Sequence, residues 1–149
     1  MKTSLTALLA LGLLAAGCNH KKDDLATPTA PAGTITFPQL LAAGTWAVAS
    51  YRQAAEDKTS QLAGYRFAFA ANGQATVSHG SSTEPGSWTW GGNSYYGTPA
   101  DSKTVVFTFS NQRPLDRISK SWIIASADDK VIELDSSNPA ELEHLTLGR

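Results

Sequence analysis

Hydrophobic and polar residues alternate with a period of two along most of the chain after Gly44. Neighbouring side chains of a strand point to opposite faces, so this alternation predicts β-strands that each bury one face. Eight such segments follow one another, at residues 45–51, 65–70, 74–79, 86–91, 103–110, 119–127, 130–135 and 143–147. Asn72-Gly73 joins the second and third segments and is the strongest two-residue signal for a β-hairpin. A short apolar segment at 37–43, ended by Gly44, predicts a turn of helix before the first strand.

The order of these elements predicts an all-β fold. The links are mostly short and no helix is long enough to connect parallel strands, so consecutive strands should pair antiparallel in an up-and-down meander. An open meander would leave two unpaired edges, which pairing of the eighth strand with the first removes. We therefore expect a domain at 37–149 that is an eight-stranded antiparallel up-and-down barrel with a short N-terminal helix.

The first 17 residues have the pattern of a signal peptide. Lys2 supplies a positive charge, and an uncharged apolar run of 12 residues follows at 5–16. Such a run is too short to cross a hydrocarbon core of about 30 Å as a helix, but it is typical of a signal peptide. It ends in Ala15-Ala16-Gly17-Cys18, which resembles the bacterial lipobox, with Ala15 where that family most often has Leu. The resemblance implies cleavage just before Cys18 and acyl chains on its thiol; the alternative is a free cysteine behind an ordinary signal peptide.

Residues 18–36 predict a flexible tether between the lipid and the barrel. The segment is polar and then rich in Ala, Thr and Pro, without helical or strand period. An acidic pair, Asp23-Asp24, resembles the surface-export signal of Bacteroidota lipoproteins; a solvated linker is the alternative. Two or three acyl chains would hold the protein at a membrane essentially permanently. We expect it in the cell envelope, anchored by lipid to the outer membrane, on a face that the sequence leaves open.

Gly44-Thr45-Trp46 opens the first predicted strand directly after the short helix. With the strand count, the hairpin and the cysteine motif, it resembles the G-x-W signature of the lipocalin superfamily, and residues 36–149 are similar to the lipocalin-like lipoproteins of Bacteroidota. The resemblance implies that Gly44 and Trp46 form the closed base of the barrel and that Arg149, just after the last strand, lies across the indole. Such a cation–π contact is worth about 0.5–2 kcal/mol. The resemblance implies no catalytic activity.

Aromatic residues occupy many inward positions of the predicted barrel. They are Phe67, Phe69, Trp88, Trp90, Phe107, Phe109 and Trp122. One interpretation is a pocket for an apolar ligand or a sugar, below the longer loops at 52–64, 80–85, 111–118 and 136–142, which the meander brings to one end. The other is that the rings fill the interior, because an eight-stranded barrel has room for side chains or for one small ligand. Tyr95-Tyr96, in the 92–102 loop, is either an exposed contact pair or packs over a barrel end.

Composition and charge add few candidates for chemistry. The formal net charge of −1 argues against a nucleic-acid partner and against a polybasic membrane patch. Cys18 is the only cysteine, His20 lies in the tether, and His79 and His144 are single, with no neighbouring ligand pair, so no catalytic thiol, metal site or other cofactor is expected. Five carboxylates in loops or at strand positions assigned to the outside are interpreted as solvated: Glu84, Glu133, Asp135, Glu141 and Glu143.

These patterns predict a monomeric lipoprotein without enzymatic activity, whose barrel binds a small apolar molecule or another envelope component. The alternative is a structural or protein-interaction module with a filled barrel. An empty interior volume of about 300 Å³ or more would favour the first hypothesis over the second.

Overall fold

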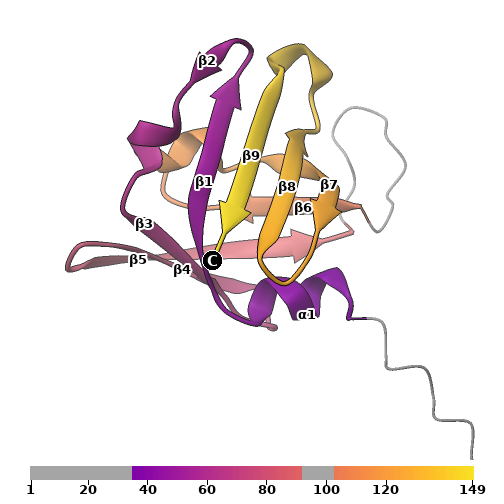
Figure 1. Cartoon of the computed structure of the whole chain (residues 1–149). Helices are drawn as coiled ribbons and strands as arrows, with labels where there is room; N and C mark the ends of the chain where they lie inside the picture. Colours follow the sequence, from indigo (N-terminus) through magenta and orange to yellow (C-terminus); the bar gives the residue numbers. More distant parts are fainter. Residues whose placement is uncertain (1–34, 92–102) are drawn as a thin grey trace, which may run out of the picture. The chain divides into compact units, whose positions relative to one another are not determined.

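The alternating segments form strands that close into a barrel (Figure 1). The computed structural model describes residues 35–91 and 103–149; the leader, Cys18, most of the tether and Tyr95-Tyr96 lie outside them. Within the described residues the strands are β1 (Thr45–Gln53), β2 (Glu56–Asp57), β3 (Tyr65–Phe69), β4 (Gln74–His79), β5 (Ser82–Trp90), β6 (Thr104–Thr108), β7 (Ser121–Ala127), β8 (Val131–Ser136) and β9 (Glu143–Gly148). The predicted fold class is confirmed.

The barrel closes because β1 pairs with both β3 and β9. All pairings are antiparallel, and the two-residue β2 adds a short hairpin to the end of β1. The register of β1 with β9 shifts between Val48 and Ser50, and this irregularity changes which side chains face inward. Tyr51 is therefore fully buried, whereas the period-two pattern starting at Trp46 would have turned Ser50 inward.

A short helix, α1 (Phe37–Ala42), covers one end of the barrel (Figure 1). Thr36 precedes it, and its backbone N–H donates to Gln39 Oε1 over 2.9 Å, which satisfies a donor at the start of the helix. Leu40 and Leu41 bury one face of the helix against the barrel. Within 35–91 and 103–149, no helix has the length and apolar character needed to cross a membrane.

The predicted start of one strand, and the loop predicted before it, were wrong. The sequence placed a loop at 80–85 and a strand from Gly86, but β5 already begins at Ser82, and the turn consists of Gly80 and Ser81. Pro85 suggested a loop because proline lacks the N–H that a ladder needs. It is tolerated here because the pairing of β5 with β6 begins only at Ser87, so Pro85 lies on a half-strand that pairs with β4 alone.

The two ends of the barrel are closed by different elements. Leu41 of α1 lies at one end. At the other, two of the connecting loops contain 3-10 turns, η1 (Thr59–Leu62) and η2 (Leu115–Arg117), and a third, η3 (Pro139–Glu141), precedes β9. Leu62, Leu115 and Ile118 are almost completely buried, so these loops carry core residues. Within the described residues, apolar side chains of the loops therefore pack into the mouth of the barrel, where one of the two sequence interpretations placed a pocket.

Candidate functional site

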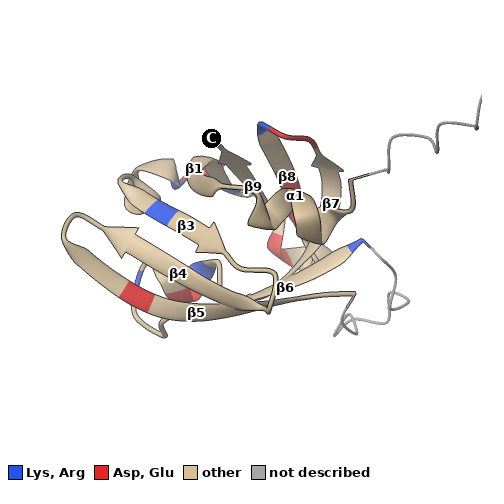
Figure 2. Ribbon diagram, turned by 90° about the horizontal axis from the view of Figure 1, so that it is seen from below, with Lys and Arg blue, Asp and Glu red and all other residues tan. Residues whose placement is uncertain are grey.

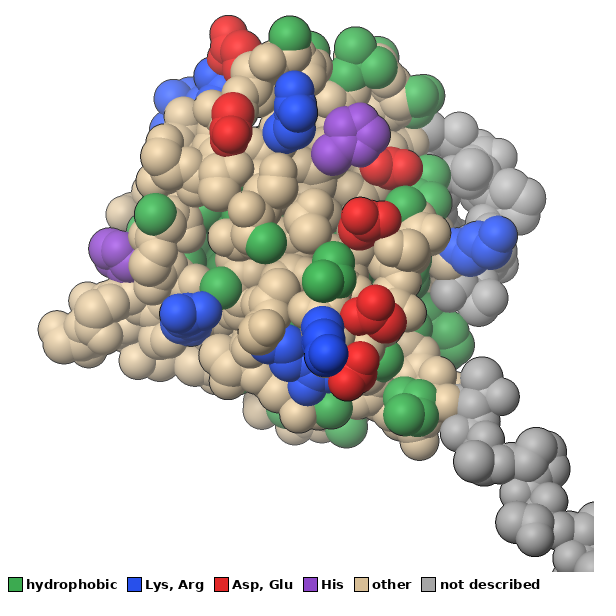
Figure 3. Space-filling view, in the orientation of Figure 1, with side chains coloured by type: hydrophobic (Ala, Val, Ile, Leu, Met, Phe, Trp, Pro, Cys, Tyr) green, Lys and Arg blue, Asp and Glu red, His purple; other side chains and the backbone are tan. Residues whose placement is uncertain are grey.

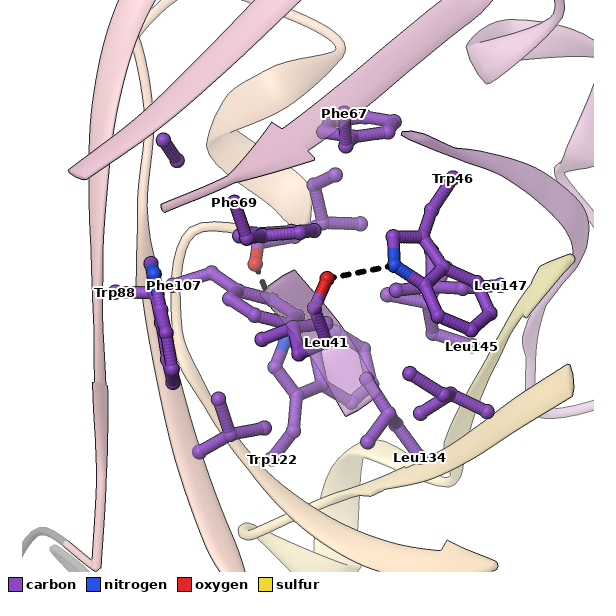
Figure 4. Packing of buried hydrophobic residues seen from close by; sticks show 14 of the residues in the cluster. Leu41, Trp46, Phe67, Phe69, Trp88, Phe107, Trp122, Leu134, Leu145 and Leu147 are labelled. Atoms are coloured by element: carbon purple, nitrogen blue, oxygen red, sulfur yellow. Dashed lines mark hydrogen bonds between the residues drawn. The ribbon is translucent and has the colours of Figure 1, made fainter. Parts of the chain in front are cut away.

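The base of the barrel is built around Trp46 (Figure 4). Its indole is fully buried, and Nε1 donates to the carbonyl of Leu41 over 2.9 Å, which ties the helix to β1. Arg149, expected to lie across this ring, has its guanidinium carbon 4.5 Å from the ring centroid. A Cβ on Gly44 would come within 2.7 Å of Arg149 Nη1, so a side chain here would displace the arginine. Because Gly44 has no side chain, Arg149 has room to lie over the Trp46 ring.

Six of the seven aromatic residues proposed for a pocket pack together inside the barrel, as Figure 4 shows for most of them. Phe69 lies 5.2 Å from Phe107 and 6.4 Å from Phe109, measured between ring centroids. Phe67 is 5.3 Å from Phe109, and Trp88 meets Phe69 edge-on at 6.3 Å. These distances are those of aromatic rings in direct contact. The rings therefore occupy the space between them rather than line a gap.

The other two tryptophans differ in their surroundings. Trp122 is fully buried, and its Nε1 donates to the carbonyl of Ile118 over 3.1 Å, so it holds the η2 loop over the barrel mouth. Trp90 was expected to face inward with Trp88, but its side chain is 40% exposed. It is the last residue of β5, which places it at the rim of the sheet.

An apolar pocket lies beside α1. Its lining residues are Ile35, Phe37, Leu40, Lys103, Ile124 and Ala127. The volume is about 160 Å³. Small-molecule sites usually enclose about 300–1,000 Å³, so this pocket is too small for a ligand of that class.

A larger and more polar pocket opens at the loop end. Its volume is about 300 Å³, and its walls come from the end of β1, from the η2 loop and from the segment that leads into β9. The lining residues are Gln53, Arg113, Asp116, Arg117, Lys120, Glu141 and Glu143. The pocket confirms that the first, fifth and seventh predicted loops share one end of the barrel. With three basic and three acidic groups, its formal charge is zero.

Glu143 forms the floor of this pocket. Only 4% of the residue is exposed, although the sequence interpretation assigned it to the surface. Glu143 Oε1 accepts a hydrogen bond of 3.1 Å from the Tyr51 hydroxyl, and Oε2 forms a close ion pair with the Lys120 ammonium. The burial of Glu143 follows from its position in β9. Glu143 lies two residues before Leu145 and four before Leu147, so the same alternation that buries those leucines turns the carboxylate inward.

Lys120 and Glu141 extend the network toward solvent. The Lys120 ammonium also donates to Glu141 Oε2 over 2.7 Å, and that carboxylate accepts further hydrogen bonds from Ser136 Oγ (2.7 Å) and Asn138 Nδ2 (3.3 Å). Lys120 Nζ also lies 5.5 Å from the centroid of the Trp122 ring. The polar network and the aromatic core therefore meet at Lys120.

The network shifts the pKa of three of its groups. Burial raises the pKa of the Tyr51 hydroxyl far above its ordinary value, and the neighbouring Glu143 carboxylate adds to this effect. Burial alone would lower the pKa of Lys120, but the hydrogen bonds and charges of Glu141 and Glu143 outweigh it and raise that pKa. For Glu141, burial acts in the other direction and would raise the pKa, but the hydrogen bonds from Lys120 and Ser136 outweigh it and lower that pKa. These side chains thus stay charged around neutral pH, except for the neutral tyrosine.

The outer face of β8 and β9 carries a second polar feature. His144 Nδ1 lies 2.5 Å from Asp135 Oδ1, so two residues that the sequence treated separately form a pair. Both side chains are largely exposed. Figure 3 looks onto the face formed by β1, β9 and β8, where acidic and basic side chains are interspersed with neutral ones. Among the residues the structure describes, no group of three or more His, Cys, Asp and Glu is placed to hold a metal ion.

Comparisons with known proteins concern the fold. A DUF4847 family protein from Bacteroides vulgatus ATCC 8482 has a similar structure, with a TM-score of 0.50, 16% identity, and coverage of 72% of this chain and 93% of that one. A lipocalin-like protein from Bacteroides uniformis ATCC 8492 also has a TM-score of 0.50, with 12% identity over 73% of this chain and 98% of that one. No protein-family model and no curated protein matches the sequence. The likeness establishes a lipocalin-like barrel.

Proposed function

We propose that this protein is a lipid-anchored lipoprotein of the cell envelope, a filled lipocalin-like barrel that binds its partner or ligand at the loop end and not in its interior. The observation that carries the second half of the proposal is the packing of Phe67, Phe69, Phe107 and Phe109 in mutual contact. Leu62 and Leu115 are buried above them, in the loops. A ligand in the interior would have to displace several of these side chains, each a loss of a few kcal/mol of packing.

The interior and the loop end differ in how they meet the requirements of a binding site. The aromatic rings pack against one another in the core, whereas the loop end has a pocket of about 300 Å³ whose lining includes charged groups from the segment 113–120 and from Glu141 and Glu143. Converging polar groups around a concave surface are typical of small-molecule sites. We propose no catalytic step, because the residues that line the pocket include no hydroxyl or thiol nucleophile, and the Tyr51 hydroxyl, which contacts Glu143, donates to that carboxylate.

Extraction of the native protein tests the filled interior. Protein purified from its own membrane is extracted with organic solvent, and mass spectrometry counts the apolar molecules released per chain. We expect none in stoichiometric amount beyond lipid attached to the chain. An apolar molecule at about one per chain, lost when Val77→Trp crowds the interior but retained in the exposed control Val131→Trp, would overturn the proposal; these two valines are 2% and 38% exposed.

Replacement of Cys18 tests the anchor. The lipobox-like Ala15-Ala16-Gly17-Cys18 motif is the support for this part of the proposal. The wild-type protein should sediment with membranes, and its N-terminal peptide should carry the mass of acyl chains. Cys18→Ser should abolish the acyl mass. A wild-type protein that has an unmodified cysteine and is recovered from the soluble fraction contradicts the anchor without affecting the barrel.

A further inference from the structure

The loop-end pocket has a surplus of hydrogen-bond donors. Both oxygens of Glu143 have partners, and both oxygens of Glu141 do as well. Arg117 is different: its Nη1 reaches Gln53 Oε1 only at 3.5 Å, and its Nε is buried without any hydrogen-bond partner. A buried guanidinium N–H without an acceptor is unfavourable, so this group would be stabilised by an acceptor that reaches it.

The other basic side chains of the pocket also have too few acceptors for their N–H donors. Arg113 Nε lies 4.0 Å from Asp116 Oδ2, at the limit of an ion pair, and its side chain is 78% exposed. Lys120 has three N–H donors, of which Glu141 and Glu143 take two. Two of the three carboxylates of this pocket, those of Glu141 and Glu143, are thus used by its own residues, while its cations retain donors. A ligand that suits the pocket must therefore supply acceptors.

Charge and volume narrow the ligand further. Basic and acidic groups balance in the pocket, so it lacks the excess of positive charge that the several negative charges of a polyphosphate would need. A single negative charge on the ligand is easier to accommodate. A guanidinium presents two parallel N–H groups whose spacing matches a carboxylate. The volume of about 300 Å³ holds a molecule of modest size. Charged side chains are sparse on β3, β4 and β5, whose sequences include only Arg66 and Glu84. Figure 2 accordingly shows these strands mostly tan, so the pocket is distinguished from this part of the surface.

From these observations we propose that the loop-end pocket binds the carboxylate of a small, singly charged organic acid, with Arg117 as the principal ligand-binding residue. The proposal rests on the proposed function, because it gives the loop end a class of ligand. Glu143 and Glu141 act as positioning residues: they hold Lys120 in place and leave its remaining donor, with Arg117 and Arg113, for the ligand.

A titration that observes the arginine directly tests the site. The purified full chain, labelled with ¹⁵N in non-ionic detergent micelles, is titrated with N-acetylglycine at constant ionic strength, and NMR follows the Nε–H signals of the arginines. We expect a saturable shift of the Arg117 signal. N-Acetylglycinamide, which has the same shape but no charge, should give no saturable shift.

Two conservative variants locate the interaction. Arg117→Lys keeps the charge but removes the two-pronged donor, and it should weaken binding at least tenfold, as read from the backbone amide signals of the η2 loop. Arg66→Lys, on β3 and away from the pocket, is the matched control and should leave the affinity unchanged. Thermal unfolding of both variants checks that each is folded; if Arg117→Lys is not, Arg113→Lys is measured in its place.

Three results would overturn the carboxylate site. They are equal shifts with the acid and the amide, affinity unchanged in the folded arginine variant, and saturation by inorganic phosphate but not by N-acetylglycine. Any of these, with no apolar molecule extracted from the barrel, would refute the carboxylate site and leave the filled-barrel proposal standing. An apolar molecule found by extraction would instead overturn the filled barrel, whatever the titration shows.

Discussion

The contact between Trp46 and Arg149 allows a quantitative test of how the barrel is closed. Trp46 is the second residue of β1 and Arg149 directly follows β9, and they meet only because these two strands pair. Trp46 is fully buried and donates to the carbonyl of Leu41. We expect Trp46→Ala to lower the free energy of unfolding by about 3–5 kcal/mol, the usual cost of removing a buried aromatic side chain. The unpaired carbonyl adds to this cost.

Arg149 should contribute much less to stability. Its guanidinium lies 4.5 Å from the ring centroid, but the residue is exposed, so we expect Arg149→Ala to cost about 0.5–1 kcal/mol. The double variant should cost less than the sum of the two single variants by about the same amount, because both remove one shared contact. Gly44→Ala provides an independent perturbation: its Cβ would displace the arginine, which has a flexible side chain. Its cost should largely disappear when Arg149 is already alanine.

Urea unfolding followed by far-ultraviolet circular dichroism measures these quantities without depending on tryptophan fluorescence. The slope of free energy against urea should stay constant across the set, which shows that the variants differ in stability and not in the surface exposed on unfolding. Strict additivity of Trp46→Ala and Arg149→Ala would refute the energetic coupling. An undiminished effect of Gly44→Ala in the arginine-free background would refute the steric account of the glycine.

Three further predictions concern the loop end and the sheet. Lys120→Ala should lower the free energy of unfolding by about 3–5 kcal/mol in chemical denaturation, because it leaves the buried Glu143 carboxylate without its cation, whereas a cost below 1 kcal/mol would contradict that pairing. The lowered pKa of Glu141 means that its contribution is present above the pKa of the unfolded chain and is lost as the pH falls through the folded value. The difference in melting temperature between wild type and Glu141→Gln should therefore shrink from pH 7 to pH 3, and a constant difference would count against it. Gly86→Ala should destabilise by about 1–3 kcal/mol, since its Cβ would lie 2.6 Å from Phe109 Cδ1; an unchanged melting temperature would show that the ring moves freely.

The order and type of the strands follow from local patterns in the sequence. Alternation from Gln74 to His79 or from Val131 to Ser136 is visible without knowledge of the partner strand, and each has one buried face in the structure. Asn72-Gly73 and the turn after Ala127 mark hairpins for local reasons too, because Asp128 Oδ1 accepts hydrogen bonds from the backbone of Lys130 and Val131. These features depend on neighbours a few residues apart.

The errors of the sequence interpretation have causes that lie farther away. The shifted register near Val48 buries Tyr51, and only the pairing of β1 with β9 produces this shift. Pro85 fits within a strand because β6 does not extend alongside it. Trp90 lies two residues after Trp88, so the alternation places both on the same face of β5, but Trp90 is exposed because it lies at the end of the strand.

The sequence by itself determined the barrel and its helix, because period-two alternation and turn residues act over short distances, and the contact expected at the base came from the resemblance of Gly44-Thr45-Trp46 to the lipocalin signature. The alternation of Glu143 with Leu145 and Leu147 also predicts that Glu143 faces inward. The sequence interpretation missed this because it assigned charged residues to the surface. Only the tertiary structure decided that the rings fill the barrel and that Leu62 and Leu115 close its mouth. Only the tertiary structure brought Gln53, Arg117 and Glu143 into one pocket. The physical reason is that packing and charge pairing depend on side chains from loops many residues apart, whose approach is fixed by barrel closure and not by any local pattern.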